Sequence, residues 1–394
     1  MTERAAQSAL VASLLARFAS EFGGSRQEAV FFAPGRVNLV GAHLDYNGGD
    51  VLPVTVDLGV YLAIRPRDDD RLRLRSVDQR DGIDARLGEL GDARRPEHGW
   101  AAYPFGVVRG LAERLPERGF DAVYGGDLPM ASGMSSSAAI EVVTAYALDR
   151  LHGLGLENRE LALICHGAES RYVGVQCGIM DQFASALGRA GHALWLHCAD
   201  ASFEYVEIHA GFQVLVLDTK KTRTLAGGAF NQRVAECGEA LAILRMHARS
   251  LPTLAAYNEA DLAHAAPWLA GVHLKRARHV VSEMQRVARG VAALRAGDSR
   301  ALGAALSSSN RSTAVDYEVS CAELDAITTA ACAQPGVFGA RLTGAGFGGC
   351  AIALIEPGSA ERVIPPVRDD FVRRFGVEPG FRVLTAGGGP RRVG

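Results

Sequence analysis

Three glycine-rich segments of the sequence carry residues that could bind and transfer a phosphoryl group. The middle segment follows an apolar run at Ala122–Tyr124, passes through Gly133 and Ser135–Ser137, and enters a helix-forming run. Exposed backbone N–H groups and the positive end of a helix attract phosphate, and serine hydroxyls can also reach Mg²⁺. A serine-capped helix after an ordinary turn would give the same pattern. The segment is neither a Walker loop nor a GxGxxG motif, because no lysine stands beside its glycines.

The first segment, Gly35–Gly49, is dense in polar side chains between two runs that resemble strands. Asp45 could accept hydrogen bonds from two sugar hydroxyls at once, and His43 could donate or accept. Arg36 could neutralise negative charge during phosphoryl transfer. Such density is typical of a site for a polyhydroxy ligand. A polar turn with solvated charges is the alternative that these residues leave open.

Two acidic residues later in the chain could take part in catalysis. Asp181 follows the apolar stretch Cys177–Met180 at the expected start of a short helix, where it could accept a hydroxyl proton. A helix cap, or a partner of the helix dipole, would also place an aspartate there. Glu169, on the preceding helix, could bind a metal ion or could be a surface charge.

The third segment, Thr343–Gly349, has four glycines in seven residues between two apolar strands. Such a run costs conformational entropy, which is expected only where the backbone must approach another group closely. A tight hairpin is the alternative, although a two-residue glycine turn would suffice for one. The segment therefore favours close contact with a ligand.

The motifs together resemble those of the GHMP small-molecule kinases and, within that family, the galactokinases. The matching stretches are Gly35–Gly41 with His43, Asp45–Asn47 and Val51–Pro53; Leu128–Ala139; Cys177–Gln182; and Thr343–Cys350. They follow the family's order along nearly the whole chain. The resemblance implies an α+β fold of two domains, with mixed and antiparallel sheets and an active site in the cleft between the domains.

The resemblance also implies a reaction: transfer of the γ-phosphoryl group of ATP to the anomeric hydroxyl of a sugar, with Mg²⁺. Asp181 would be the catalytic base, and Arg36 would keep it ionised and neutralise the transferring group. His43, Asp45 and the backbone at Gly178 would contact the sugar. Ser137 and Glu169 would hold Mg²⁺. The nucleotide would meet Gly133, Met134, Ser135, Ser136, Ser137, Ala138, Gly344 and Gly346, with Trp100 and Tyr103 beside adenine unless these two are ordinary core aromatics.

Two positions of the sugar site depart from the family pattern. The family has a glutamate, which meets the C6 hydroxyl of the sugar, where this chain has Ala42, and a sugar-contacting tyrosine where it has Phe230. Losing the carboxylate costs on the order of 1–3 kcal/mol if the hydroxyl stays unpaired, but it also removes a repulsion. We expect galactose as the substrate. Galacturonate, or another C6-altered relative of galactose, is the alternative, and plant galacturonate kinases similarly have Gly-Ala-His here.

A regulator that binds galactose and ATP without turnover is an alternative from another functional class. Such a protein can lose residues of the phosphate loop. Here Ser135–Ala139 is intact, and Arg36, Glu169 and Asp181 are all present. The sequence therefore favours a catalyst over a regulator.

The elements that hold these segments follow from the apolar pattern. Helical periodicity predicts helices over residues 10–22, 138–151, 161–172, 226–247, 277–296, 314–333 and 367–375, and a short one near Asp181. Strands are expected over residues 29–32, 54–65, 122–124, 193–197, 212–217 and 381–385, on both sides of the third glycine segment, and as edge hairpins around 72–77. A domain boundary near residue 205 gives domains 1–204 and 205–394, and residues 386–394 resemble a frayed tail.

The composition excludes several classes of protein. With 48% hydrophobic and 22% charged residues and a net charge of −2, the chain is a folded protein without a strong field for nucleic acid or membranes. Seven cysteines without close pairing argue against a disulfide framework and a zinc site. The N-terminal helix is not a signal peptide, and no apolar run could span a bilayer. We expect a cytoplasmic monomer whose partners are ATP and a small sugar.

Overall fold

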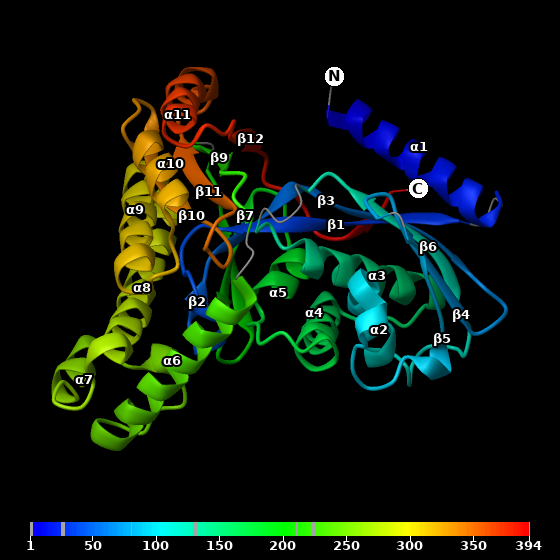
Figure 1. The fold of residues 1–394 in the computed structure, drawn as a ribbon, viewed down its shortest axis with the longest axis horizontal. Coiled ribbons are helices and arrows are strands. Elements are labelled where there is room, and N and C mark those ends of the chain that lie inside the picture. Colours follow the sequence, from blue (N-terminus) through cyan, green and yellow to red (C-terminus); the bar gives the residue numbers. More distant parts are fainter. Residues whose placement is uncertain are drawn as a thin grey trace.

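The computed structural model describes residues 3–24, 28–79, 81–128, 133–209, 211–222 and 226–393. Three sheets organise these residues (Figure 1). The largest has the order β13-β1-β3-β6-β4-β5, with β1 (Ala29–Asn38), β3 (Pro53–Pro66), β4 (Arg71–Ser76), β5 (Ile83–Arg86), β6 (Phe120–Gly126) and β13 (Arg391–Arg392). The second has the order β10-β11-β9-β12, with β9 (Gln213–Asp218), β10 (Val337–Leu342), β11 (Cys350–Ile355) and β12 (Gly380–Leu384). The third has the order β2-β7-β8, with β2 (Asp50–Val51), β7 (His192–His197) and β8 (Ser202–Glu207).

Neighbouring strands are antiparallel except where β4 runs parallel to β6. Strand β1 is buried along its whole length, because both faces of its sheet are covered. Alternate side chains point to opposite faces. Phe32 packs with Phe18 of α1 (Glu3–Phe22) on one face, and Phe31 enters the main core on the other. This double burial explains why the start of β1 reads as a continuous apolar run.

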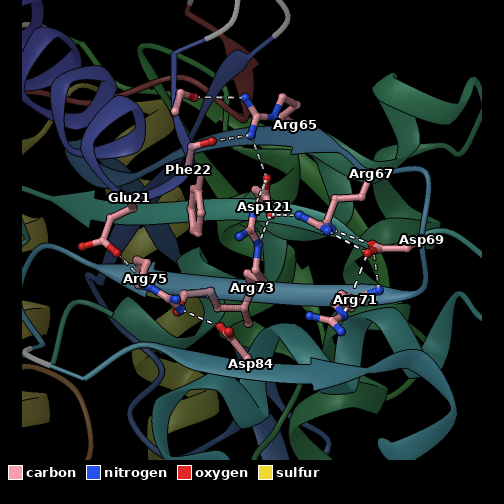
Figure 2. A network of polar contacts seen from close by, with 12 residues as sticks. Glu21, Phe22, Arg65, Arg67, Asp69, Arg71, Arg73, Arg75, Asp84 and Asp121 are labelled. Atoms are coloured by element: carbon pink, nitrogen blue, oxygen red, sulfur yellow. Dashed lines mark hydrogen bonds and ion pairs between the residues drawn. The ribbon is translucent and has the colours of Figure 1, made fainter.

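A network of ionic contacts ties α1 to the outer face of the large sheet (Figure 2). The buried carboxylate of Asp121 accepts hydrogen bonds from Arg65, Arg67 and Arg73 at 2.9, 2.9 and 2.6 Å. Arg65 also donates to the carbonyl oxygen of Phe22 at the last turn of α1, and the guanidinium of Arg73 lies 4.7 Å from the centre of the Phe22 ring. Asp121 thus binds arginines from two strands and the turn beside them, and through Arg65 it helps to hold the end of α1 on the sheet.

Helices α2 (Ala102–Gly110), α3 (Ser136–His152), α4 (Asn158–Gly167) and α5 (Met180–Leu187) cover the other face of the large sheet, and a π-helical turn at Ala168–Val173 follows α4 (Figure 1). The remaining helices are α6 (Ala226–His247), α7 (Glu259–His264), α8 (Gly271–Arg295), α9 (Ser299–Val315), α10 (Ala322–Cys332) and α11 (Ala360–Phe375). Short 3₁₀ turns lie at Asp45–Asn47, Leu87–Glu89, Pro96–Ala101 and Leu254–Ala256. Within the described ranges, no helix has the length and apolar character needed to cross a membrane.

The structure confirms the α+β class and most predicted elements, but several predicted helices were wrong in extent, and α1 and α8 begin earlier than expected, at Glu3 and Gly271. The helix expected over 314–333 corresponds to α10, which begins only at Ala322, because α9 ends at Val315 and the chain turns at Glu318, where φ is 56°. The helix expected over 367–375 already begins at Ala360, ahead of two prolines. Helices α2 and α7, nearly all of α9, and strands β2, β8 and β13 were not predicted. The division at 204/205 stays a prediction; residue 205 lies within β8.

The prediction of a frayed tail after Ala386 was also wrong. Arg391 and Arg392 pair with Phe32 and Phe31 of β1, and the backbone N–H of Gly387 donates to the carbonyl of Thr55 at 2.8 Å. The edge of β1 would otherwise present unpaired backbone groups. The tail satisfies them, which a pattern search along the sequence cannot see.

Candidate active site

A cavity of about 620 Å³ brings together residues that the sequence analysis selected from distant parts of the chain. The selected residues that line it are Arg36, Ala42, His43, Asp45, Tyr103, Glu169, Gly178, Asp181, Phe230 and Gly344. Arg341 and Asn231 line it as well. The first segment, Gly35–Gly49, which we call the sugar segment after its expected ligand, therefore shares one cavity with the acidic residues and the third glycine segment.

Asp181 lies in the first turn of α5, where two side chains hold its carboxylate. Arg36 donates to Oδ1 from Nε at 2.7 Å and from Nη2 at 2.6 Å, and the hydroxyl of Ser135 donates to Oδ2 at 2.5 Å. Arg36 is only 4% exposed and also donates from Nη1 to the carbonyl of Gly133 at 2.6 Å. The carboxylate is thus fixed at both oxygens while 28% of its side chain stays exposed.

The local backbone explains how Arg36 reaches this position. The register of β1 against β3 shifts between Pro34 and Arg36, which turns the arginine toward α5. Gly35 lets β1 meet the middle glycine segment, because a Cβ at this position would lie 2.7 Å from the carbonyl oxygen of Met134.

The middle glycine segment bends sharply before α3. Ser135 has a φ of 59°, a left-handed conformation that is strained for a residue with a side chain, and Gly133 has a φ of 77°. Ser135 precedes α3 but makes no side-chain capping bond, since its hydroxyl goes to Asp181. Met134 and Ala138 are buried, whereas Ser136 is exposed at the helix start. The preceding part of the phosphate motif, residues 129–132, lies outside the described residues.

The sugar segment holds His43 in a left-handed conformation, with a φ of 57°. Its side chain is 7% exposed and lines the cavity, where Nε2 is buried without a hydrogen-bond partner among the described residues. Burial, with the nearby charges of His279 and Arg341, lowers the pKa of His43 to about 3, so the ring is neutral. A buried polar atom without a partner, in a residue that lines a cavity, is suited to meet a ligand.

Asp45 lies close enough to Asp181 for their charges to interact. Desolvation and the negative charge of Asp181 raise the pKa of Asp45 to about 6, although the positive charge of Arg36 acts to lower it. Its carboxylate packs directly on Gly178, where a Cβ would lie 2.4 Å from Asp45 Oδ2. Only glycine leaves room for this contact, so position 178 shapes the wall beside Asp45.

Glu169 belongs to a buried acidic group near Asp181. Burial and then the charge of Asp181 raise the pKa of Glu169 to about 7, while hydrogen bonds from Gln182 and Ser137 act in the opposite direction. The amide nitrogen of Gln182 lies 2.5 Å from Glu169 Oε2 and 3.0 Å from Glu141 Oε2. In the described part of the chain, no group of three His, Cys, Asp or Glu side chains could form a metal centre by itself.

Of the two aromatic residues that were predicted to lie beside adenine, Trp100 and Tyr103, only Tyr103 lines the cavity. Trp100 packs edge-on against Tyr124 with ring centres 5.3 Å apart. The Nε1 atom of Trp100 is buried and has no partner within the described structure. In the third glycine segment, Gly344 lines the cavity, and Gly346 packs against the Val319 backbone, where a Cβ would lie 2.2 Å from its carbonyl oxygen.

Two residues of α8 that the sequence analysis missed, His279 and Glu283, bind the backbone of the sugar segment. The backbone N–H groups of Gly41 and Ala42 donate to Glu283 Oε1 at 2.9 and 3.0 Å, and His279 Nε2 lies 3.0 Å from the carbonyl oxygen of Ala42. Although burial acts to raise it, Arg286 and other nearby positive charges lower the pKa of Glu283 to about 2. Polar residues at positions 279, 283 and 286 on one face of α8 were the available signal.

Comparisons with known protein families agree with this geometry. The galactokinase galactose-binding signature matches residues 16–66, the GHMP kinases N terminal domain matches 102–189, and the GHMP kinases C terminal model matches 291–373. The first of these ranges includes Arg36, His43 and Asp45, and the second includes the middle glycine segment and Asp181. The family models therefore cover the selected residues that line the cavity, except Phe230.

Individual proteins are similar over nearly their whole length. The galactokinase of Chloroflexus aggregans is 42% identical, covering 91% of each chain, and that of Chloroflexus aurantiacus is 41% identical, covering 96% of this chain and 97% of the relative. A crystal structure of Lactococcus lactis galactokinase complexed with galactose has a TM-score of 0.93 and 33% identity, covering 97% of this chain and 100% of that one. The Methanococcus jannaschii mevalonate kinase shares the fold, with a TM-score of 0.67, 17% identity, and coverage of 93% of this chain and 100% of its own. With such similarity along almost the entire sequence, the chain belongs to the galactokinase family of GHMP kinases.

Proposed function

We propose that the protein transfers the γ-phosphoryl group of ATP to the anomeric hydroxyl of galactose, giving galactose 1-phosphate and ADP. The observation that carries this proposal is the position of Asp181, which Arg36 and Ser135 hold at the wall of a cavity that the sugar segment also lines. The similar proteins are galactokinases, and one of them is complexed with galactose.

In the proposed mechanism, Asp181 accepts the proton of the sugar hydroxyl as that oxygen attacks the γ-phosphorus of ATP. The bond between this phosphorus and the bridging oxygen to the β-phosphate breaks, and ADP leaves. Arg36 and Ser135 contribute by orienting the carboxylate before the reaction, so that little reorganisation is needed. The charge of Arg36 also opposes the negative charge of the transferring group.

The sugar would be held by His43, by Asp45 and by the backbone at Gly178. The unpartnered Nε2 of His43 and the carboxylate of Asp45 offer polar contacts within the same cavity. A sugar carries several hydroxyl groups, each able to donate and to accept. This wall therefore suits a monosaccharide, and its place beside Asp181 puts one hydroxyl within reach of the base.

The nucleotide phosphates would bind at the start of α3 and along the glycine segment at Gly133–Ser137, since free N–H groups at a helix start attract anions. Ser137 and Glu169 would hold Mg²⁺, which neutralises phosphate charge when it is bound. The buried carboxylate of Glu169 fits a cation, because burial and the charge of Asp181 make its ionised form costly without one. Phosphate oxygens and water would complete the coordination.

A second candidate substrate is galacturonate, a sugar with a carboxylate at C6. Ala42 and Phe230 line the cavity, and so does Arg341, which is 1% exposed and donates to the backbone carbonyls of Leu342 and Leu39. An anionic substituent here would meet an alanine instead of a carboxylate, with a guanidinium in the same cavity. Rates with galactose and galacturonate decide between the candidates, and a higher kcat/KM on galactose rejects the second.

The substitution Asp181→Asn tests the proposed base. It should abolish sugar-dependent ADP release while ATP binding, measured by calorimetry, stays as in the wild type. Asp261→Asn is a matched control, because Asp261 also lies in the first turn of a helix and is held by an arginine, Arg249, at 2.8 and 2.6 Å. Turnover by Asp181→Asn at the rate of this control would reject the mechanism.

A further inference from the structure

A line of hydrogen-bonding side chains connects the C-terminal half of the protein to His43 in the cavity wall. The Nδ1 atom of His43 lies 2.8 Å from the Tyr46 hydroxyl, which lies 2.7 Å from the Tyr317 hydroxyl. Asn47 Nδ2 lies 3.5 Å and Cys237 Sγ 3.1 Å from the same Tyr317 oxygen. Tyr317 stands between α9 and α10, is completely buried, and does not line the cavity.

The direction of the hydrogen bonds in this line follows from the groups at its far end. Asn47 Nδ2 also donates to the backbone carbonyl of His43 at 2.8 Å, and because a carbonyl only accepts, the orientation of the amide is fixed. The same nitrogen can only donate to Tyr317, whose oxygen therefore accepts. The proton of Tyr317 then points to Tyr46, since a phenol oxygen accepts more strongly than the sulfur of Cys237.

The direction of the hydrogen bond between Tyr317 and Tyr46 determines which ring nitrogen of His43 carries the proton. With its oxygen accepting from Tyr317, Tyr46 directs its own proton to Nδ1 of His43. A neutral imidazole carries one ring proton, so that proton is on Nε2. This is the atom that is buried in the cavity wall without a partner among the described residues.

We propose that Tyr317 and Tyr46 are positioning residues that hold His43 as the Nε2–H tautomer, so that the cavity offers a hydrogen-bond donor at this point. The ligand atom that meets His43 is then an acceptor, such as the oxygen of a hydroxyl or a carboxylate. Taking this ligand to be a sugar rests on the proposed function, whereas the tautomer does not.

The opposite direction of the line predicts the opposite ligand chemistry. Nδ1–H of His43 would donate to Tyr46, Tyr46 to Tyr317, and the phenol proton of Tyr317 would end on the sulfur of Cys237, a weak acceptor. His43 would then present a lone pair to the cavity and bind only a donor. A direct measurement of the tautomer separates the two directions.

The test is nitrogen NMR of the full-length protein labelled with ¹⁵N-histidine, near neutral pH and without ligand. The signals of His43 are identified by their loss in His43→Gln. We expect Nδ1 to show the shift of an unprotonated nitrogen and Nε2 that of a protonated one. Since this measurement needs neither a variant of the tyrosines nor any catalytic turnover, it stands even if the proposed substrate is wrong.

The variant Tyr317→Phe tests the positioning role. Without the Tyr317 hydroxyl, the Tyr46 oxygen can accept from Nδ1–H, so a second tautomer of His43 should appear. The KM for the sugar should rise by about twofold or more, because only molecules with the Nε2–H tautomer keep the donor, and the KM for ATP should be unchanged. Tyr257→Phe is the control, because it removes another buried hydroxyl, which donates to the backbone carbonyl of Arg249 and is not a member of this line.

Two results would overturn the proposal. One is a wild-type protein in which the ring proton of His43 lies on Nδ1. The other is a Tyr317→Phe variant with the wild-type tautomer and the wild-type KM for the sugar. If Tyr317→Phe does not fold, Tyr46→Phe replaces it, since it removes the donor to Nδ1 directly and should give a mixture of tautomers.

Discussion

Replacing Arg36 with methionine removes the charge that faces Asp181 while keeping an unbranched side chain in the same space. In the wild-type protein, Arg36 makes two hydrogen bonds to Asp181, at 2.7 and 2.6 Å, and one to the carbonyl of Gly133 at 2.6 Å. Because Arg36 is 4% exposed, water cannot readily take its place. The variant therefore leaves Asp181, the proposed base, without its main orienting contact.

The size of the effect follows from these contacts. A hydrogen bond to a charged group contributes about 1.5–3 kcal/mol. The two bonds to Asp181 share one oxygen of a partly exposed carboxylate, so we assign about 3 kcal/mol to the pair after allowing for solvent screening. If this is lost from the transition state, kcat falls roughly a hundredfold. Loss of the charge that faces the transferring group adds to this value.

The assay is the initial rate of ADP release over a range of galactose and ATP concentrations. Both kcat and kcat/KM should fall by at least about a hundredfold, since the contact acts in the transition state, and the KM for ATP should stay near the wild-type value. Arg249→Met is the control, because it removes an arginine with the same two contacts to an aspartate outside the cavity. A kcat for Arg36→Met within about tenfold of the wild type would refute the reasoning.

Three further predictions concern the substrate, the pH dependence and the stability. Ala42→Glu should raise kcat/KM for galactose and lower it for galacturonate, each by about tenfold, and rates that change in the opposite sense would contradict the role of position 42. Because desolvation and Asp181 raise the pKa of Asp45 to about 6, the KM for the sugar should rise as the pH falls through this value and the carboxylate is protonated; an unchanged KM across this range would show that Asp45 does not bind the sugar. Asp121→Ala should lower the free energy of unfolding in urea by about 3 kcal/mol, since three arginines lose their shared carboxylate. Asp69→Ala, at a more exposed carboxylate that also binds Arg67, should have a much smaller effect.

The candidate site could be predicted from the sequence to the extent that its residues lie in segments with an unusual local composition. Gly35 and Gly178 each stand where a side chain would collide with another part of the site. The requirement for glycine at these two positions is therefore visible in the sequence. Asp181 was a candidate from its place at a helix start within an apolar stretch, and the resemblance of the motifs to those of the GHMP kinases made it the expected base. The sequence could not show that Ser135 donates to Asp181, because that contact joins the turn before α3 to a residue of α5.

Other parts could not be predicted because they depend on contacts between distant residues. Glu283 lies on a long helix with many charged residues, and only the folded chain shows that it binds the backbone of the sugar segment. Tyr317 falls within a run that looked like one continuous helix, and its burial beside Tyr46 accompanies the break between α9 and α10. The tail was assigned as frayed because its pairing with β1 leaves no apolar pattern.

The central claim is that Asp181 and its neighbours direct a phosphoryl group to the anomeric oxygen of galactose. The most direct measurement is phosphorus NMR of the products after the wild-type protein has acted on galactose, ATP and Mg²⁺. We expect ADP and a sugar phosphate whose phosphorus couples to the anomeric proton. A phosphate on any other oxygen of the sugar, or ATP that is hydrolysed to inorganic phosphate without a sugar phosphate, would contradict the claim.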